Sequence, residues 1–155
     1  MTAPVIDKPI PDLEVQATSD RRFKLSDLKG KNFVLYFYPK DHTSGCTTEG
    51  RDFRDHYAEF QKLNCEILGV SRDLLRTHEN FRSKQEFPFD LISDGEEALC
   101  KLFDVIHEKT MYGKKHMGVV RSTFVIDDKG VLRKEFRKVK VAGHVEEVLE
   151  AVKSL

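Results

Sequence analysis

The sequence predicts an α/β fold built on a mixed sheet, and three observations predict it. Residues 33–38 and 66–71 are runs of strand length dominated by apolar side chains. Each run is followed by a segment with the periodicity of an amphipathic helix, the pattern of parallel strands joined by crossover helices. A later pair of strands is joined by a tight turn at 128–130, which predicts an antiparallel hairpin. Together these features imply a mixed sheet flanked by helices.

The remaining elements follow from local patterns. A weakly alternating segment predicts an edge strand, and a turn leads from it to a short second strand, so we expect an N-terminal β-hairpin extension. No repeat or long linker divides the 155 residues, which predicts a single domain over residues 1–155. The expected strands lie at 13–17, 23–25, 33–38, 66–71, 89–92, 120–127 and 131–136, and the expected helices at 26–30, 47–63, 74–84, 96–103 and 144–155.

The composition excludes several classes of protein. The 26 basic and 26 acidic side chains give zero formal net charge, which argues against binding nucleic acid or an anionic membrane. No apolar run approaches the roughly 20 residues that span a bilayer, and the N-terminus lacks the pattern of a signal peptide. The six histidines show no metal-ligand spacing, so no metal site is expected, and Lys114–His116 is expected in a solvated loop. Three cysteines do not make a disulfide framework, and we expect reduced thiols in the cytoplasm.

Cys46 is the candidate nucleophile. It follows the apolar strand at 33–38 and opens a predicted helix, where unpaired N–H groups and the positive end of the helix dipole favour the thiolate. An inert core cysteine is the alternative, but it leaves the loop before Cys46 without explanation. Four further residues continue from Cys46 at the spacing of one helix face, which places Cys46 at the head of the stripe that faces the sheet: Gly50, Phe53, Tyr57 and Phe60.

The loop at 39–45 lies where α/β sheets place their sites, beyond the carboxyl end of a strand. Pro39 ends the strand. Thr43 precedes Cys46 by three residues, so its hydroxyl is expected near the sulfur. A helix-capping residue is the alternative for Thr43, and capping is compatible with catalysis. Gly45 lets the backbone pass close to a group bound over Cys46.

At this loop the sequence resembles the peroxiredoxins. Pro39, Thr43 and Cys46 match the PxxxTxxC signature of that family, and the run YPKDHTSGCTTEGRDFRD is similar to its bacterioferritin comigratory protein (Q-type) branch. The resemblance implies a thioredoxin-like fold and a thiol-dependent peroxidase that acts on hydrogen peroxide and organic hydroperoxides. Three further segments agree with this branch, at residues 91–105, 111–118 and 121–136.

The resemblance also implies roles for individual residues. Cys46 corresponds to the peroxidatic cysteine, which attacks the O–O bond and becomes a sulfenic acid. Thr43 corresponds to the residue that positions the peroxide, and Pro39 to the residue that shields the sulfur. Arg121 corresponds to the arginine that stabilises the thiolate and the developing charge, with a surface salt bridge as its alternative. No metal, flavin or haem cofactor is implied, because the thiolate carries the redox chemistry.

One departure from the branch concerns the resolving cysteine. Many members carry it five residues after the first cysteine, where this chain has Arg51, and others carry it in the next helix, near Arg82. Cys65 is expected to be structural, because the predicted helix separates it from Cys46 by roughly 25 Å. Cys100 is a resolving candidate only after local unfolding. Otherwise we expect a one-cysteine enzyme, a monomer or weak homodimer, recycled by thioredoxin, glutaredoxin or glutathione.

Two questions stay open at this point. Glu49 either pairs with an arginine such as Arg121, or is a first-turn acid favoured by the helix dipole. The alternative to a peroxidase is a redox-sensing or holdase-type binding protein on the same fold, in which oxidation of Cys46 is a signal. A thiol–disulfide oxidoreductase is weighed lower, because no second cysteine lies at C-x-x-C spacing from Cys46.

Overall fold

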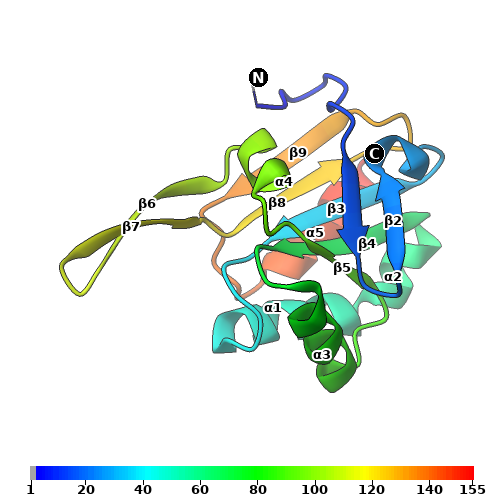
Figure 1. Cartoon of the computed structure of the whole chain (residues 1–155). Coiled ribbons are helices and arrows are strands. Elements are labelled where there is room, and N and C mark those ends of the chain that lie inside the picture. Colours follow the sequence, from blue (N-terminus) through cyan, green and yellow to red (C-terminus); the bar gives the residue numbers. More distant parts are fainter. Residues whose placement is uncertain (1–2) are drawn as a thin grey trace.

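The computed structural model describes residues 3–155, which form a central seven-stranded sheet and a separate two-stranded hairpin (Figure 1). The order of strands in the large sheet is β2-β1-β5-β4-β3-β8-β9. Strands β3, β4 and β5 are parallel to one another, and the other neighbours are antiparallel, so the predicted mixed sheet is confirmed. The strands are β1 (Glu14–Ala17), β2 (Arg21–Lys24), β3 (Asn32–Phe37), β4 (Cys65–Ser71), β5 (Asp90–Ser93), β8 (Ser122–Ile126) and β9 (Leu132–Arg137).

The two faces of the sheet carry separate hydrophobic clusters, because successive side chains of a strand point to opposite faces. On one face, Phe33, Leu35 and Phe37 of β3 pack with residues of η1 (Leu25–Leu28) and α4 (Ala98–Leu102). On the other face, the alternate β3 residues pack with the four remaining helices. These helices are α1 (Ser44–Asp55), α2 (Tyr57–Lys62), α3 (Leu75–Gln85) and α5 (His144–Lys153). Cys46 belongs to the second cluster and Cys100 to the first, so the sheet separates them.

Three predicted elements are corrected by the structure. Strand β1 is not an edge strand, because it pairs with β5 as well as with β2. The helix predicted at 47–63 is divided into α1 and α2 at His56, whose backbone leaves helical geometry and whose ring Nδ1 lies 2.9 Å from the carbonyl oxygen of Asp52. The helix predicted at 96–103 is shortened to α4, because Glu97 adopts a left-handed backbone conformation just before it.

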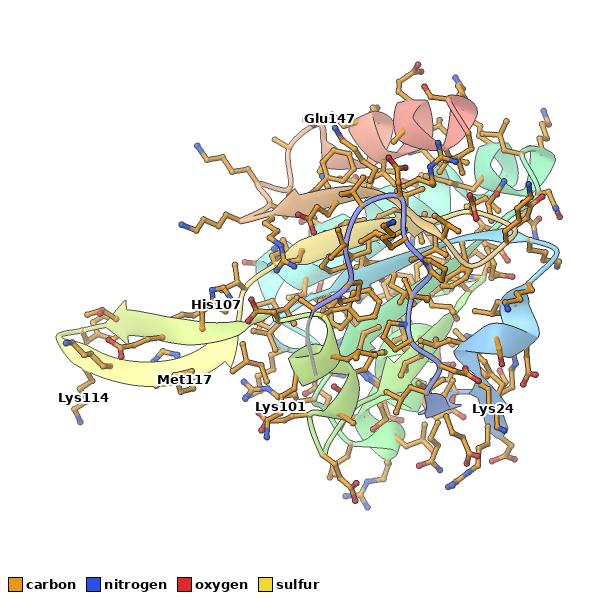
Figure 2. All side chains as sticks on the ribbon, turned by 90° about the horizontal axis from the view of Figure 1, so that it is seen from above. Lys24, Lys101, His107, Lys114, Met117 and Glu147 are labelled. Carbon is orange, nitrogen blue, oxygen red and sulfur yellow. The ribbon has the colours of Figure 1, made fainter. Side chains whose placement is uncertain are left out.

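A further correction concerns Lys114–His116, which lies in a strand rather than a loop. Strands β6 (Ile106–Met111) and β7 (Lys114–Val119) form an antiparallel hairpin that projects from the body of the molecule (Figure 1). Figure 2 shows the labelled side chains of His107, Lys114 and Met117 along this arm. The hairpin is exposed along most of its length, so its sequence lacks the apolar alternation that reveals a half-buried strand. Its turn, Tyr112–Gly113, has positive φ at both residues, as type I′ turns require.

Among residues 3–155, none of the helices combines the length and the apolar character needed to cross a bilayer.

Candidate active site

The sheet brings the start of α1 and Arg121 to the same edge. Strand β3 leads into the loop at 39–43, and α1 begins at Ser44, so Cys46 is the third residue of that helix. Strand β8 runs antiparallel to β3, with Ser122 opposite Phe37, so the residue just before β8 lies beside the carboxyl end of β3. That residue is Arg121. Strand pairing therefore unites two residues that are 75 positions apart in the chain.

The guanidinium of Arg121 joins two side chains of α1. Its Nη2 donates a hydrogen bond to Cys46 Sγ at 3.4 Å, and its Nη1 donates one to Glu49 Oε1 at 2.6 Å. Cys46 is 2% exposed and Glu49 is fully buried. This answers the open question on Glu49, which pairs with Arg121. The approach is close: a Cβ on Gly45 would lie 3.1 Å from Arg121 Nη2, so a residue without a side chain suits this position.

The charges of the Arg121–Glu49 pair affect each other unequally. Burial raises the pKa of Glu49 to about 7, and the attraction of Arg121 only partly opposes that rise. Burial works against the charge of Arg121 as well, but Glu49 and Cys46 together outweigh it and raise its pKa. Among the described residues, Glu49 Oε2 is a buried atom without a hydrogen-bond partner. The site thus holds a permanent cation against the sulfur and a carboxyl group that ionises near neutral pH.

The structure places the other two predicted residues in the loop before α1. Pro39 is partly buried and lies two residues after the end of β3. Thr43 is exposed, and its hydroxyl donates a hydrogen bond to the carbonyl oxygen of Lys40 at 2.7 Å. Thr43 occupies the N-cap position of α1, but its side chain makes no capping bond to the helix. Its hydroxyl is therefore not committed to the helix backbone.

The other two cysteines have surroundings that suppress the thiolate. Cys65 begins β4, at the end of the sheet opposite Cys46, and burial together with Glu66 raises its pKa to about 12. Cys100 is fully buried on the other face of the sheet, and burial together with Asp94 raises its pKa well above the usual range for a thiol. Cys46, Cys65 and Cys100 are all free thiols. The thiol in contact with a cation is Cys46.

Two polar residues near the site were missed from the sequence. Asp41 and His78 are buried and lie in contact, with Asp41 Oδ2 2.6 Å from His78 Nδ1. With Asp73 they form a group whose potential metal-ligand atoms lie within 4.8 Å of one another. His78 lies three residues before Phe81, on the buried face of α3, so its place on the apolar stripe is a signal that could have found it.

Comparison with known proteins identifies the family of this chain. Residues 6–135 match the model of the AhpC/TSA family. The chain is 49% identical to Peroxiredoxin Bcp of Xanthomonas campestris pv. campestris, with 99% of this chain and 98% of the relative covered. It is also 49% identical to Peroxiredoxin Bcp of Bacillus subtilis, with 97% and 96% covered.

Solved structures agree with these relatives. The bacterioferritin comigratory protein of X. campestris is 50% identical and superposes with a TM-score of 0.88 over 92% of this chain and 90% of that one. A cysteine-to-serine variant of PrxQ from Xylella fastidiosa is 40% identical, with a TM-score of 0.93 over 99% and 98%. The expected thioredoxin-like fold is therefore confirmed, and a binding protein that only senses oxidation is not favoured. The chain belongs to the AhpC/TSA family, within its Bcp or Q-type peroxiredoxin branch, and is a thiol peroxidase.

Proposed function

We propose that Cys46 is the nucleophile with which this peroxidase reduces hydrogen peroxide and organic hydroperoxides. The thiolate attacks one oxygen of the peroxide, the O–O bond breaks, and the second oxygen leaves as hydroxide or alkoxide, which takes a proton from solvent to become water or an alcohol. Cys46 is left as a sulfenic acid. The observation that carries the proposal is the hydrogen bond of 3.4 Å from Arg121 Nη2 to Cys46 Sγ. A cation there stabilises the thiolate before attack and the oxyanion as it leaves.

The roles proposed for the loop residues follow from their places. Thr43 carries an exposed hydroxyl three residues before Cys46, where it can turn towards a peroxide bound at the helix N-terminus. Pro39 is partly buried in the loop and has no N–H group to compete for the sulfur. Solved structures of the X. campestris relative concern its alkyl peroxide reduction activity, which supports organic hydroperoxides as one substrate class.

We propose a one-cysteine cycle in which an outside thiol, such as thioredoxin, glutaredoxin or glutathione, reduces the sulfenic acid. Arg51 occupies the position of the usual resolving cysteine, and its Nε donates a hydrogen bond to Gln85 Oε1 of α3 at 2.9 Å. Near the alternative position for a resolving cysteine, Arg82 donates a hydrogen bond to the carbonyl oxygen of Phe89. Cys100 lies beyond the sheet from Cys46, which argues against it as a resolving partner. Three free thiols fit a reducing compartment such as the bacterial cytoplasm.

The first experiment is the intact mass of the reduced protein after one equivalent of hydrogen peroxide, without any other thiol. A gain of one or two oxygens, located on Cys46 by peptide mapping, is the expected result. Loss of two hydrogens would contradict the one-cysteine cycle and implicate Cys100. An unchanged mass would contradict the proposed role of Cys46.

Cys46→Ser should abolish peroxide consumption, because Cys46 is the thiol that accepts a hydrogen bond from a cation among the residues that the structure describes. Consumption is measured with dithiothreitol as the reductant. Cys65→Ser is the matched control, since it replaces another buried free thiol at the opposite end of the sheet, and it should keep the full rate. Activity in Cys46→Ser comparable to that of the control would sink the assignment.

A further inference from the structure

A buried polar network lies behind the loop that leads to Cys46. At its centre are Asp41 and His78, whose side chains are 0% exposed and whose Oδ2 and Nδ1 atoms lie 2.6 Å apart. Tyr38 donates its hydroxyl to Asp41 Oδ1 at 2.6 Å, and His78 Nε2 lies 2.9 Å from the carbonyl oxygen of Ile92. The network joins the loop after β3 to α3 and β5. None of these groups takes part in the chemistry proposed above.

The hydrogen bonds determine where the protons lie. A carbonyl oxygen can only accept a hydrogen bond. His78 Nε2 therefore carries a hydrogen and donates a hydrogen bond to the carbonyl oxygen of Ile92. One further proton lies between His78 Nδ1 and Asp41 Oδ2. Each of these atoms, and Asp41 Oδ1 beside Tyr38, then has a hydrogen-bond partner. Removing either side chain would leave the other polar group buried without its partner, which is costly in a site of low dielectric. The two residues therefore act as a unit.

This unit holds the loop against α3. The backbone N–H of Asp41 donates to Asp73 Oδ2 at 2.9 Å, so the main chain is held as well as the side chain. The ring of His42 meets the ring of Phe81 of α3 edge-on, with centroids 5.0 Å apart. His42 has a φ of 63°, a left-handed conformation that is uncommon for histidine and that the surrounding contacts maintain. Thr43 follows directly.

A bound cation is not needed to explain the cluster of Asp41, Asp73 and His78. Asp73 Oδ2 already accepts hydrogen bonds from the Asp41 backbone and from the hydroxyl of Ser71. The nearest atoms of Asp41 and His78 are bonded to each other. These polar groups are therefore satisfied by hydrogen bonds within the chain.

We propose that Asp41 and His78 are a positioning pair for the peroxide site. By holding the loop on α3, they keep Thr43 and the first turn of α1 in place, so that Cys46 stays aligned with Arg121 and with the incoming O–O bond. The inference rests on the proposed role of Cys46. Nucleophilic attack on a peroxide needs alignment of the sulfur with the breaking bond, and a displacement of about 1 Å can lower a rate by about 10²-fold.

The test compares two substitutions of Asp41 with a control aspartate. Asp41→Ala removes the network, whereas Asp41→Asn can keep all three side-chain bonds by accepting from Tyr38 and donating to a neutral His78. Asp127→Ala is the control: Asp127 is also buried and accepts bonds from two backbone N–H groups, but it follows the end of β8 opposite Arg121. The rate of Cys46 oxidation is measured by competition with a haem peroxidase for hydrogen peroxide. The measured rate is then divided by the fraction of Cys46 that is ionised, which is obtained from the thiolate absorbance at 240 nm, to give the rate per thiolate.

We expect Asp41→Ala to lower the rate per thiolate by at least about tenfold, with Asp41→Asn within about threefold of the wild type. Asp127→Ala should lose stability but keep the wild-type rate. A wild-type rate in Asp41→Ala, an equal loss in Asp41→Asn, or an equal loss in Asp127→Ala would overturn the proposal.

A second variant keeps the test decisive if Asp41→Ala does not fold. Tyr38→Phe removes one bond to Asp41 and preserves the ring, so it should slow the reaction by roughly twofold to fivefold, and an unchanged rate would overturn the proposal. Failure of the proposed role of Cys46 looks different, because it appears in the wild-type protein itself as an absence of reaction with peroxide.

Discussion

Cys46 and Cys100 occupy the same position in two helices and have opposite electrostatic surroundings. Each is the third residue of a helix that follows a parallel strand of the central sheet, α1 after β3 and α4 after β5. Cys46 Sγ accepts a hydrogen bond from Arg121. The backbone N–H of Cys100 instead donates to the carboxylate of Asp94 at 2.7 Å, and that carboxylate also accepts from Leu99. At Cys100 the acid already uses the free N–H groups of the helix.

A helix N-terminus therefore does not by itself make a reactive thiol. The free N–H groups of a first turn attract any anion, and a carboxylate at Cys100 takes the place that a thiolate could use. The pKa of Cys100 is raised first by burial and then by Asp94, so two causes act against ionisation there. At Cys46 the sulfur accepts a hydrogen bond from the guanidinium of Arg121, which also donates a hydrogen bond to Glu49.

The largest expected effect comes from removing the cation on the Cys46 side. Arg121→Gln should lower the rate of Cys46 oxidation by roughly 10²- to 10³-fold, the usual loss when a donor to a developing oxyanion is removed. Arg121→Lys keeps a charge but lacks the fork that reaches both Cys46 and Glu49, so its loss should be smaller, about tenfold. Rates are measured at pH 7 together with the thiolate fraction.

Arg133→Gln is the matched control for these variants, because Arg133 also pairs with carboxylates but lies on β9, away from Cys46. It should react at the wild-type rate. If Arg121→Gln reacts as fast as this control, the cation does not explain why Cys46 is reactive and Cys100 is not.

The next effect concerns Glu49, the acid behind the cation. Its pKa is about 7 in the folded protein against a usual 4.5, so the folded state holds the proton more tightly than the unfolded state. The stability from this group is therefore present below pH 4.5 and is lost as the pH rises through 7. Glu49→Gln should remove that loss, so that between pH 5 and pH 8 the variant gains about 2–3 kcal/mol of unfolding free energy relative to the wild type.

Urea unfolding at the two pH values measures this difference. Glu59→Gln, an exposed acid on α2, serves as the control and should show no such change. A parallel pH dependence in wild type and Glu49→Gln would show that Glu49 does not titrate in the neutral range.

The smallest effect comes from removing the anion on the Cys100 side. Asp94→Asn leaves one oxygen to serve two backbone N–H groups, which should cost about 1–2 kcal/mol of stability by urea unfolding. Cys100 should still resist one equivalent of hydrogen peroxide in a Cys46→Ser background, because burial is the larger cause of its raised pKa. Oxidation of Cys100 in that variant, seen by peptide mass, would mean that Asp94 alone keeps the thiol inactive.

Much of the fold could be predicted from the sequence because its elements are half-buried or fully buried. β3 and β4 are continuous runs of mostly apolar residues that are buried on both faces of the sheet, and their predicted positions agree with the structure to within a few residues. The hairpin of β6 and β7 was not predicted, because exposed strands carry no pattern of burial. The long helix is divided at His56, where the backbone leaves helical geometry, although the apolar spacing continues through this position and so does not report the break.

The candidate site was predictable where its residues lie together in the chain. Pro39 and Thr43 stand in one loop, and Cys46 follows in the first turn of α1, all at a recognisable spacing. Asp41 stands in the same loop, but its importance depends on His78, 37 residues later, and nothing local links the two. Whether Cys100 could act as a resolving cysteine depended on which face of the sheet its helix covers. The spacing of residues along the chain does not indicate that face.

The amino-acid sequence was enough to identify most strands and helices, the candidate nucleophile at a helix N-terminus and the lack of a cysteine at the usual resolving positions. Which charges meet which thiol depends on the tertiary structure. Apolar periodicity and motif spacing record the environment of a few neighbouring residues. The order and register of strands decide which distant side chains touch, because they bring Arg121 at the start of β8 beside the end of β3 and set Cys100 across the sheet from Cys46.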